Sequence, residues 1–180
     1  MTMRDLDQAE AVLTARLDEL GIAWTSERHA PVFTVEQART LGMQLGGGGT
    51  KNLFLRDRRK RFVLLVANED TLVDLKSLAA EWDVGRLSFA RPEALADVLG
   101  VTPGAVSPFA LMNTAPGTLR VVVDARLTEH KLLLFHPLRN DATIAVSPKG
   151  LLTFLRACGH EPEVRALGAP DRTTRPHAAR

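Results

Sequence analysis

Two apolar segments separated by a short charged turn restrict what this chain can fold into more than any other feature. Residues 51–56 and 61–67 are rich in Leu, Val and Phe, and the turn Asp57–Lys60 lies between them. Apolar runs of this length that flank polar turn residues are typical of paired strands. We therefore expect an antiparallel hairpin on which the other elements pack.

Short strands and helices alternate along the rest of the chain. The leucines of residues 3–20 lie on one stripe and predict a helix. Thr34 and Gln37 form a capping box, which predicts a short helix over residues 35–41. Further helices are expected over 75–82, 92–99 and 148–158, an extended segment over 22–26, and strands over 87–89, 120–124, 132–135 and 143–146. This interleaving predicts an α/β or α+β domain with a mixed sheet.

Composition limits the class of protein. The chain has 180 residues, of which 45% are hydrophobic and 24% charged, with a net charge of +2, as expected of one globular domain. No apolar run approaches the roughly 20 residues of a membrane span, and acidic residues near the N-terminus argue against a signal peptide. We expect a cytoplasmic protein with no membrane partner. Residues 168–180 predict a disordered basic tail behind a domain of residues 1–167.

Cysteine and histidine are placed in ways that argue against a metal site. Cys158 is the one cysteine, and its apolar neighbours favour a core position over a catalytic thiol. None of the five histidines has the spacing of a helical zinc motif. No G-x-G-x-x-G follows a strand, which argues against a dinucleotide site. We therefore expect neither a metal nor another cofactor.

The run Gly46–Gly49 leads directly into Thr50, Lys51 and Asn52. Glycine lets backbone N–H groups approach a ligand closely, and a lysine at the mouth of such a loop is a cation with three donors. This pattern favours a site for a phosphate or a carbonyl, with a flexible loop as the alternative. The order of residues does not meet the phosphate-loop pattern, which argues against a nucleoside triphosphatase.

His136 is the most informative histidine because it ends an apolar strand and precedes Pro137. The residue before a proline is held extended, so the ring is aimed from a rigid strand end. A purely structural histidine is the alternative. The sequence contains no G-x-S-x-G elbow and no pattern of a Ser-His-Asp triad, so it presents no obvious nucleophile.

Four segments together match a known family in order and spacing. They are residues 31–36, 50–57, 100–106 and 135–143. The chain resembles the YbaK/ProX family, which is related to the editing insertion domain of bacterial prolyl-tRNA synthetase, and within it the free-standing alanyl-tRNA(Pro) deacylases. The resemblance runs from about residue 5 to residue 166. It implies a mixed, mostly antiparallel sheet flanked by helices.

The resemblance implies trans-editing, in which alanine wrongly attached to proline tRNA is released by ester hydrolysis without a metal. The implied partners are misacylated tRNA(Pro) and prolyl-tRNA synthetase, with no DNA. A pocket of alanine size would exclude proline sterically, as the second sieve of an editing pair does. Two alternatives stay open. One is deacylation of another misacylated tRNA such as Cys-tRNA(Pro), and the other is a non-catalytic tRNA-binding module.

The resemblance also assigns roles to matched residues. Lys51 matches a lysine that engages the phosphate of the terminal adenosine, Asn52 presents its backbone near the scissile carbonyl, and His136 lies in the pocket. The implied substrate-binding residues are Ser26, Gly100, Pro103 and Gly104. The basic turn is our candidate for tRNA contact, with a solvated turn as the alternative; its residues are Arg56, Arg58, Arg59, Lys60 and Arg61.

Two positions depart from the family pattern. Relatives read G-G-H-T-K-N, and Gly49 stands here in place of the histidine. Relatives also often have Asn-Asp where this chain has Asn113-Thr114, which leaves an aspartate role at that point without a residue to perform it.

Overall fold

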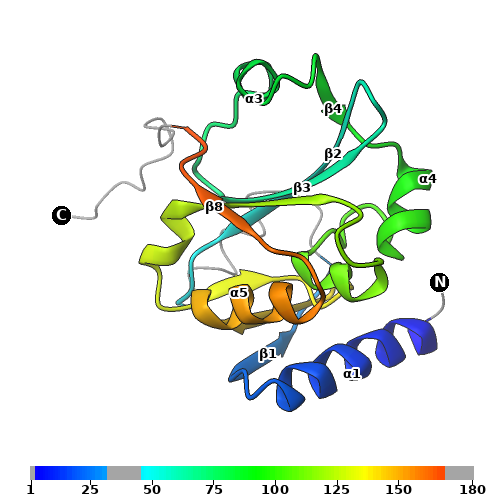
Figure 1. The fold of residues 1–180 in the computed structure, drawn as a ribbon. Helices are drawn as coiled ribbons and strands as arrows, with labels where there is room; N and C mark the ends of the chain where they lie inside the picture. The colour runs from blue at the N-terminus through cyan, green and yellow to red at the C-terminus, as the bar shows by residue number, and fades with distance from the viewer. Residues whose placement is uncertain (1–2, 32–45, 169–180) are drawn as a thin grey trace.

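The computed structural model describes residues 3–31 and 46–168, which form two β-sheets with helices packed around them (Figure 1). The helices are α1 (Met3–Glu19), α3 (Leu75–Glu81), α4 (Pro92–Ala94), the π-helix η1 (Leu95–Leu99), the 3-10 helices η2 (Pro108–Asn113) and η3 (Ala125–Glu129), and α5 (Pro148–Ala157). The strands are β1 (Trp24–Arg28), β2 (Thr50–Asp57), β3 (Phe62–Asn68), β4 (Leu87–Phe89), β5 (Arg120–Asp124), β6 (Leu133–Phe135), β7 (Ala142–Val146) and β8 (Glu163–Arg165). The helix expected over 35–41 and the tail after residue 168 lie outside the described residues.

The predicted hairpin is confirmed and forms the centre of the larger sheet. β2 pairs antiparallel with β3, and the five strands lie in the order β4-β2-β3-β5-β8. The second sheet has the order β1-β7-β6 and is antiparallel throughout. Among the strand pairs of residues 3–31 and 46–168, β3–β5 and β5–β8 are parallel and the others antiparallel, so the expectation of mixed, mostly antiparallel pairing is confirmed.

The strands divide into two sheets, a division that the expected mixed sheet did not specify. The sheets meet at a single parallel bridge between Gly48 and Leu133. Beyond it β2 leaves β6 and pairs with β3 and β4 instead. The strand β8 was not anticipated; it has three residues and lies at the sheet edge, which gives little sequence signal.

The main core lies between the two sheets and extends to helices α1 and α5. It contains Leu13 and Leu17 of α1, Phe54 of β2, and Phe154 of α5, all buried. A second cluster lies on the other face of the five-stranded sheet, under α3. The stripe of leucines predicted for the first helix therefore serves the core as expected.

Local signals explain where several helices begin and end. Ser147 accepts a hydrogen bond from Gly150 N–H (3.0 Å) and Pro148 follows it, as predicted for the start of α5. Gly100 ends η1 with φ +65°, a left-handed conformation that favours glycine. Among the helices of residues 3–31 and 46–168, none combines the length and apolar character that crossing a bilayer requires.

Candidate active site

The edge of β2 that faces away from β3 pairs with no other strand at Asn52 within residues 3–31 and 46–168, and we call this unpaired position the opening. On this edge Gly48 donates its N–H to the carbonyl of Leu132 in the segment leading into β6 (2.9 Å). Further along, the carbonyl of Phe54 accepts from Ala90 N–H (2.9 Å), next to the pairing with β4. Backbone groups alternate in direction along a strand, so Asn52 shares the direction of Gly48 and Phe54. Its N–H and C=O therefore point into the opening between the β6 and β4 pairings.

The glycine run is a packed connector between the sheets. A Cβ on Gly47 would lie 2.7 Å from the Leu134 side chain, and a Cβ on Gly48 would lie 2.6 Å from the His130 ring. Gly46 has φ +67°. Side chains at Gly47 and Gly48 would force their neighbours to move, whereas at Gly46 it is the left-handed backbone that favours glycine. Close packing therefore explains the glycines, and the N–H of Gly48 is used within the fold instead of being offered to a ligand.

Gly49 lies against an acidic side chain. A Cβ at this position would collide with the carboxylate of Glu69, and the Gly49 carbonyl accepts from Glu69 N–H (3.0 Å). The space that the histidine of the family pattern requires is thus occupied here by Glu69.

Lys51 and Asn52 project to opposite faces of β2, as successive strand residues do. The Nζ of Lys51 donates to the carbonyls of Glu69 (3.0 Å) and Thr71 (2.5 Å), in the segment that follows β3. The ammonium group therefore lies over the segment that follows β3, on the face of the sheet that carries the second cluster.

The Asn52 side chain holds the loop before η2. Its Nδ2 donates to the carbonyl of Val106 (3.2 Å), and its Oδ1 is buried without a hydrogen-bond partner in the described part of the chain. In this loop Pro103 precedes Gly104, which has φ +88°, and Ala105 N–H closes the turn onto the Thr102 carbonyl (3.1 Å). Asn52 therefore joins β2 to the predicted substrate loop.

His136 follows β6 and has a defined tautomer. Its Nδ1 lies 3.0 Å from the carbonyl of Ala142, which can only accept, so Nδ1 carries the proton and Nε2 has a lone pair. Burial lowers the pKa of His136 below its ordinary 6.5, and the neighbouring His29 acts in the same direction, against the Ala142 bond. The ring is thus neutral at pH 7 and can accept a hydrogen bond or a proton.

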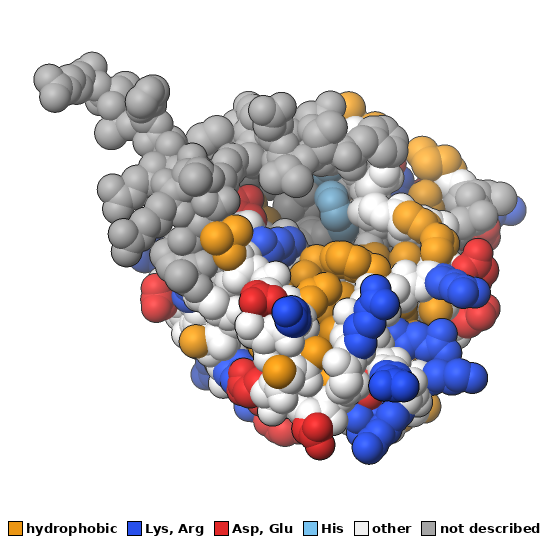
Figure 2. Space-filling model, turned by 90° about the horizontal axis from the view of Figure 1, so that it is seen from above, with side chains coloured by type: hydrophobic (Ala, Val, Ile, Leu, Met, Phe, Trp, Pro, Cys, Tyr) orange, Lys and Arg blue, Asp and Glu red, His pale blue; other side chains and the backbone are white. Residues whose placement is uncertain are grey.

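His29 is a residue that our sequence reasoning did not select. Its ring centroid lies 6.4 Å from that of His136. Its Nδ1 donates to the Ala30 carbonyl (2.8 Å), and its Nε2 lies 2.9 Å from the Thr143 hydroxyl oxygen. His29 follows β1 and His136 follows β6, and no local pattern links these two distant segments. Figure 2 shows a hollow on the surface with a histidine ring inside it and apolar side chains beside it.

The structure does not bring Ser26 to this histidine pair. Ser26 lies opposite Ile144 in the β1–β7 register and is exposed. Residues paired across strands share a face of the sheet, whereas Thr143 points to the other face because it precedes Ile144. Ser26 and the Thr143 hydroxyl that binds His29 are therefore on opposite faces.

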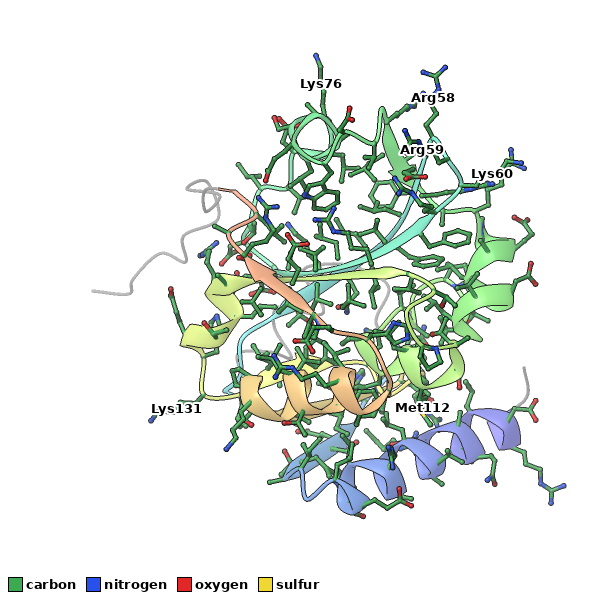
Figure 3. All side chains as sticks on the ribbon, viewed as in Figure 1. Arg58, Arg59, Lys60, Lys76, Met112 and Lys131 are labelled. Carbon is green, nitrogen blue, oxygen red and sulfur yellow. The ribbon has the colours of Figure 1, made fainter. Side chains whose placement is uncertain are left out.

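The basic turn divides into exposed and internally paired residues. Arg61 donates from Nε to the buried Asp57 carboxylate (2.7 Å), and Arg56 lies over the Phe62 ring at 5.9 Å. Arg58, Arg59 and Lys60 extend from the tip of the hairpin into solvent (Figure 3). The tip is about 20 Å from Lys51, at roughly 3.3 Å per strand residue.

The groups described at this site are hydrogen-bonding groups of the backbone and of a histidine ring. The opening presents backbone polar groups of Asn52, and His136 presents a neutral ring. A backbone N–H aimed at an opening can stabilise a developing oxyanion. Within residues 3–31 and 46–168, no three His, Cys, Asp or Glu side chains are grouped to hold a metal ion.

Comparison with known proteins identifies related sequences. Residues 29–154 match the family described as the aminoacyl-tRNA editing domain. The chain is 38% identical over 157 residues to the prolyl-tRNA editing protein ProX of Acetoanaerobium sticklandii, which covers 87% of this chain and 95% of that protein. It is 37% identical over 155 residues to prolyl-tRNA synthetase associated domain-containing protein 1 of Xenopus laevis, covering 83% and 92%.

A solved structure has the same fold. It is a candidate trans-editing enzyme for prolyl-tRNA synthetase, with a TM-score of 0.68 and 18% sequence identity, over 89% of this chain and 97% of that one. At this identity the similarity concerns the arrangement of the sheets and helices.

Proposed function

The chain belongs to the aminoacyl-tRNA editing family and is an aminoacyl-tRNA deacylase, and from this premise we propose that it hydrolyses Ala-tRNA(Pro). The reaction cleaves the ester between alanine and the terminal ribose and yields free alanine and tRNA(Pro). The observation that carries this proposal is the 38% identity, over 95% of its length, to a protein named for prolyl-tRNA editing.

In the proposed reaction the terminal nucleotide crosses the edge of β2 at the opening. Lys51 binds the phosphate of this nucleotide on one face of β2. The backbone N–H of Asn52 donates to the carbonyl oxygen of the ester as negative charge develops on that oxygen. The ribose 2′-hydroxyl of the substrate helps to activate the attacking water. The neutral Nε2 of His136 accepts a hydrogen bond in the pocket, which a protonated ring could not do.

The proposed selectivity for alanine is steric. The loop that carries Gly100, Pro103 and Gly104 is held against β2 by the Asn52–Val106 hydrogen bond, which favours a pocket of fixed size. A fixed pocket of alanine size excludes proline, the correct amino acid. Cys-tRNA(Pro) is the second candidate substrate, because the cysteine side chain has one non-hydrogen atom more than the alanine side chain.

The proposed partners are misacylated tRNA(Pro) and prolyl-tRNA synthetase. The names of the relatives support both, since one refers to prolyl-tRNA editing and the other to prolyl-tRNA synthetase. The exposed basic residues at the hairpin tip are suited to phosphate contacts, since Lys and Arg supply most of the affinity for nucleic acid backbones.

A panel of charged tRNAs tests the proposal. The purified chain is incubated with Ala-tRNA(Pro), Cys-tRNA(Pro), Pro-tRNA(Pro) and Ala-tRNA(Ala), and the remaining aminoacyl ester is measured over time. We expect rapid loss of alanine from tRNA(Pro) alone. If cysteine is lost faster than alanine, Cys-tRNA(Pro) is the substrate instead. Binding of tRNA without loss of any amino acid would indicate a non-catalytic module.

A further inference from the structure

The ammonium group of Lys51 is held by two carbonyl oxygens that belong to one short segment. We propose that Thr71 and Asp124 are positioning residues for Lys51, acting through the segment 69–71. The inference rests on the proposed function, because it concerns the lysine assigned to the terminal phosphate. Nζ donates to the Glu69 carbonyl at 3.0 Å and to the Thr71 carbonyl at 2.5 Å.

A buried carboxylate fixes this segment to the larger sheet. Thr71 and Asp124 are both fully buried, and the Thr71 hydroxyl donates to Oδ2 of Asp124 (2.5 Å). The same carboxylate accepts from the N–H of Asn68 (3.3 Å) and from the N–H of Arg126 (3.2 Å). Asp124 ends β5 and caps η3, so its position is determined by two elements at once.

Further hydrogen bonds fix the segment 69–71 to its surroundings. The Nη1 of Arg126 donates to the Thr71 hydroxyl oxygen (3.0 Å), so this oxygen both donates and accepts. Thr71 N–H closes onto the Asn68 carbonyl (3.0 Å), and Glu69 N–H donates to Gly49 at the start of β2 (3.0 Å). The carbonyls that hold Lys51 are therefore fixed relative to β2, β3 and β5 together.

Carbonyl ligands suit a lysine that must bind an anion. A carbonyl oxygen is neutral, so these two hydrogen bonds orient the ammonium without changing its charge. A lysine side chain loses rotamer freedom when it is fixed, and ordering it before binding removes that entropic cost from the complex. Asp124 thus acts on Lys51 through the Thr71 hydroxyl and the adjoining backbone.

Substitution of Thr71 separates this role from general stability. Thr71→Val removes the hydroxyl at nearly constant shape, Thr71→Ser restores it, and Thr71→Ala is a second variant that places no branched methyl beside the carboxylate. Thr128→Val is the matched control, because Thr128 is an exposed threonine of η3 outside this network. Each variant is also combined with Lys51→Ala, and thermal unfolding is recorded for all.

We expect Thr71→Val to lower kcat/KM for deacylation roughly tenfold, the scale of a lost hydrogen bond to a charged group, with recovery in Thr71→Ser. The double variant with Lys51→Ala should be no slower than Lys51→Ala alone, because Thr71 acts through the lysine. Additive losses in the double variant, or full activity in the folded Thr71→Val and Thr71→Ala variants, would overturn the proposal.

A spectroscopic readout tests the same claim without activity. The 15N–1H signal of the Lys51 ammonium, assigned by its absence in Lys51→Ala, should be observable in the wild type and in Thr71→Ser and broadened in Thr71→Val. An unchanged signal in Thr71→Val would contradict the positioning role. If the wild type cleaves no aminoacyl-tRNA, the proposed function fails and this signal alone decides the inference.

Discussion

At the scale of single residues, the protonation of His136 links its surroundings to the proposed chemistry. Burial and the neighbouring His29 lower the pKa of His136, and the Ala142 carbonyl holds the proton on Nδ1. The neutral ring persists to a pH below the ordinary value of 6.5. A hydrogen-bond acceptor at Nε2 is thus present throughout the neutral range.

We therefore expect kcat/KM for deacylation to stay constant from pH 8 to pH 6.5 and to fall at lower pH, as His136 gains a proton. His136→Gln should slow the reaction roughly tenfold, the scale of a lost hydrogen bond, and should remove this acidic limb. The pH–rate profiles of both proteins provide the check. An identical acidic limb in the glutamine variant would assign it to another group.

At the scale of elements, the β2–β3 hairpin carries different tasks at its two ends. The Asn52 end forms the opening, and the tip exposes Arg58, Arg59 and Lys60. The buried Asp57 carboxylate holds the turn: burial alone would raise its pKa, but hydrogen bonds from Arg61 lower it. The tip is therefore a rigid basic projection.

The double substitution Arg58→Glu/Arg59→Glu tests contact between this tip and tRNA. We expect weaker tRNA binding and a slope of log K against log salt reduced by about 2, since each lost phosphate contact removes about one unit. Lys131→Glu is the control, because Lys131 is exposed far from the hairpin tip (Figure 3). Unchanged affinity and salt slope in the double variant would remove the tip from the interface.

Helix α1 is attached to the rest of the domain by a buried ion cluster. Arg139 is 2% exposed; its Nη1 lies 3.3 Å from the Glu10 carboxylate and its Nη2 lies 2.8 Å from that of Asp141. Arg28 reaches the same Glu10 at 2.6 Å, but its side chain is half exposed. The two arginines share acidic partners and differ in burial.

This difference predicts unequal effects of the same substitution. Arg139→Met should lower the free energy of unfolding by about 3–5 kcal/mol, because it leaves Glu10 buried without its buried partner. Arg28→Met should cost at most about 1 kcal/mol, as for exposed pairs. Urea denaturation measures both. Equal losses would show that burial does not determine the contribution of this cluster.

At the scale of the whole molecule, acidification should destabilise the fold in two steps. Burial lowers the pKa of His160 and of His136, so near pH 6.5 the unfolded chain takes up protons that the folded chain does not. Stability is complete above pH 6.5 and falls as the pH drops toward the lowered values. Asp141, whose pKa Arg139 lowers, adds a second loss as the pH falls below its ordinary 3.8.

Urea denaturation at pH 7.5, 6.5 and 5.5 checks the first step. We expect the free energy of unfolding to decrease between pH 6.5 and 5.5, and to decrease less in His160→Gln, which cannot be protonated. A stability that is flat over this interval would contradict buried neutral histidines.

Sequence reasoning recovers the parts of this molecule that local patterns determine. The hairpin, the strand 87–89 and the start of α5 follow from apolar periodicity and capping residues, all of which act over a few positions. The division into two sheets depends on where β6 leaves β2, and the pairing of His29 with His136 depends on strands distant in the chain. The opposite faces of Ser26 and Thr143 follow from register, which no local pattern specifies.

The site illustrates the same limit. Lys51, Asn52 and His136 could be selected from motifs, but the carbonyls that hold Lys51 and the opening at Asn52 require the strand order. The sequence of the glycine run favours an anion site or a flexible loop, whereas contacts with Leu134 and His130 explain Gly47 and Gly48.

Single-turnover hydrolysis of Ala-tRNA(Pro) is the measurement that bears most directly on the proposed function. Wild type, Lys51→Ala and the surface control Lys131→Ala are compared at saturating protein, with Pro-tRNA(Pro) as the second substrate. We predict rapid release of alanine by the wild type and the control, a rate at least about 100-fold lower for Lys51→Ala, equivalent to roughly 2.7 kcal/mol, and no release of proline. Stable Ala-tRNA(Pro) in the presence of the wild type, or equal rates for the two lysine variants, would contradict this account.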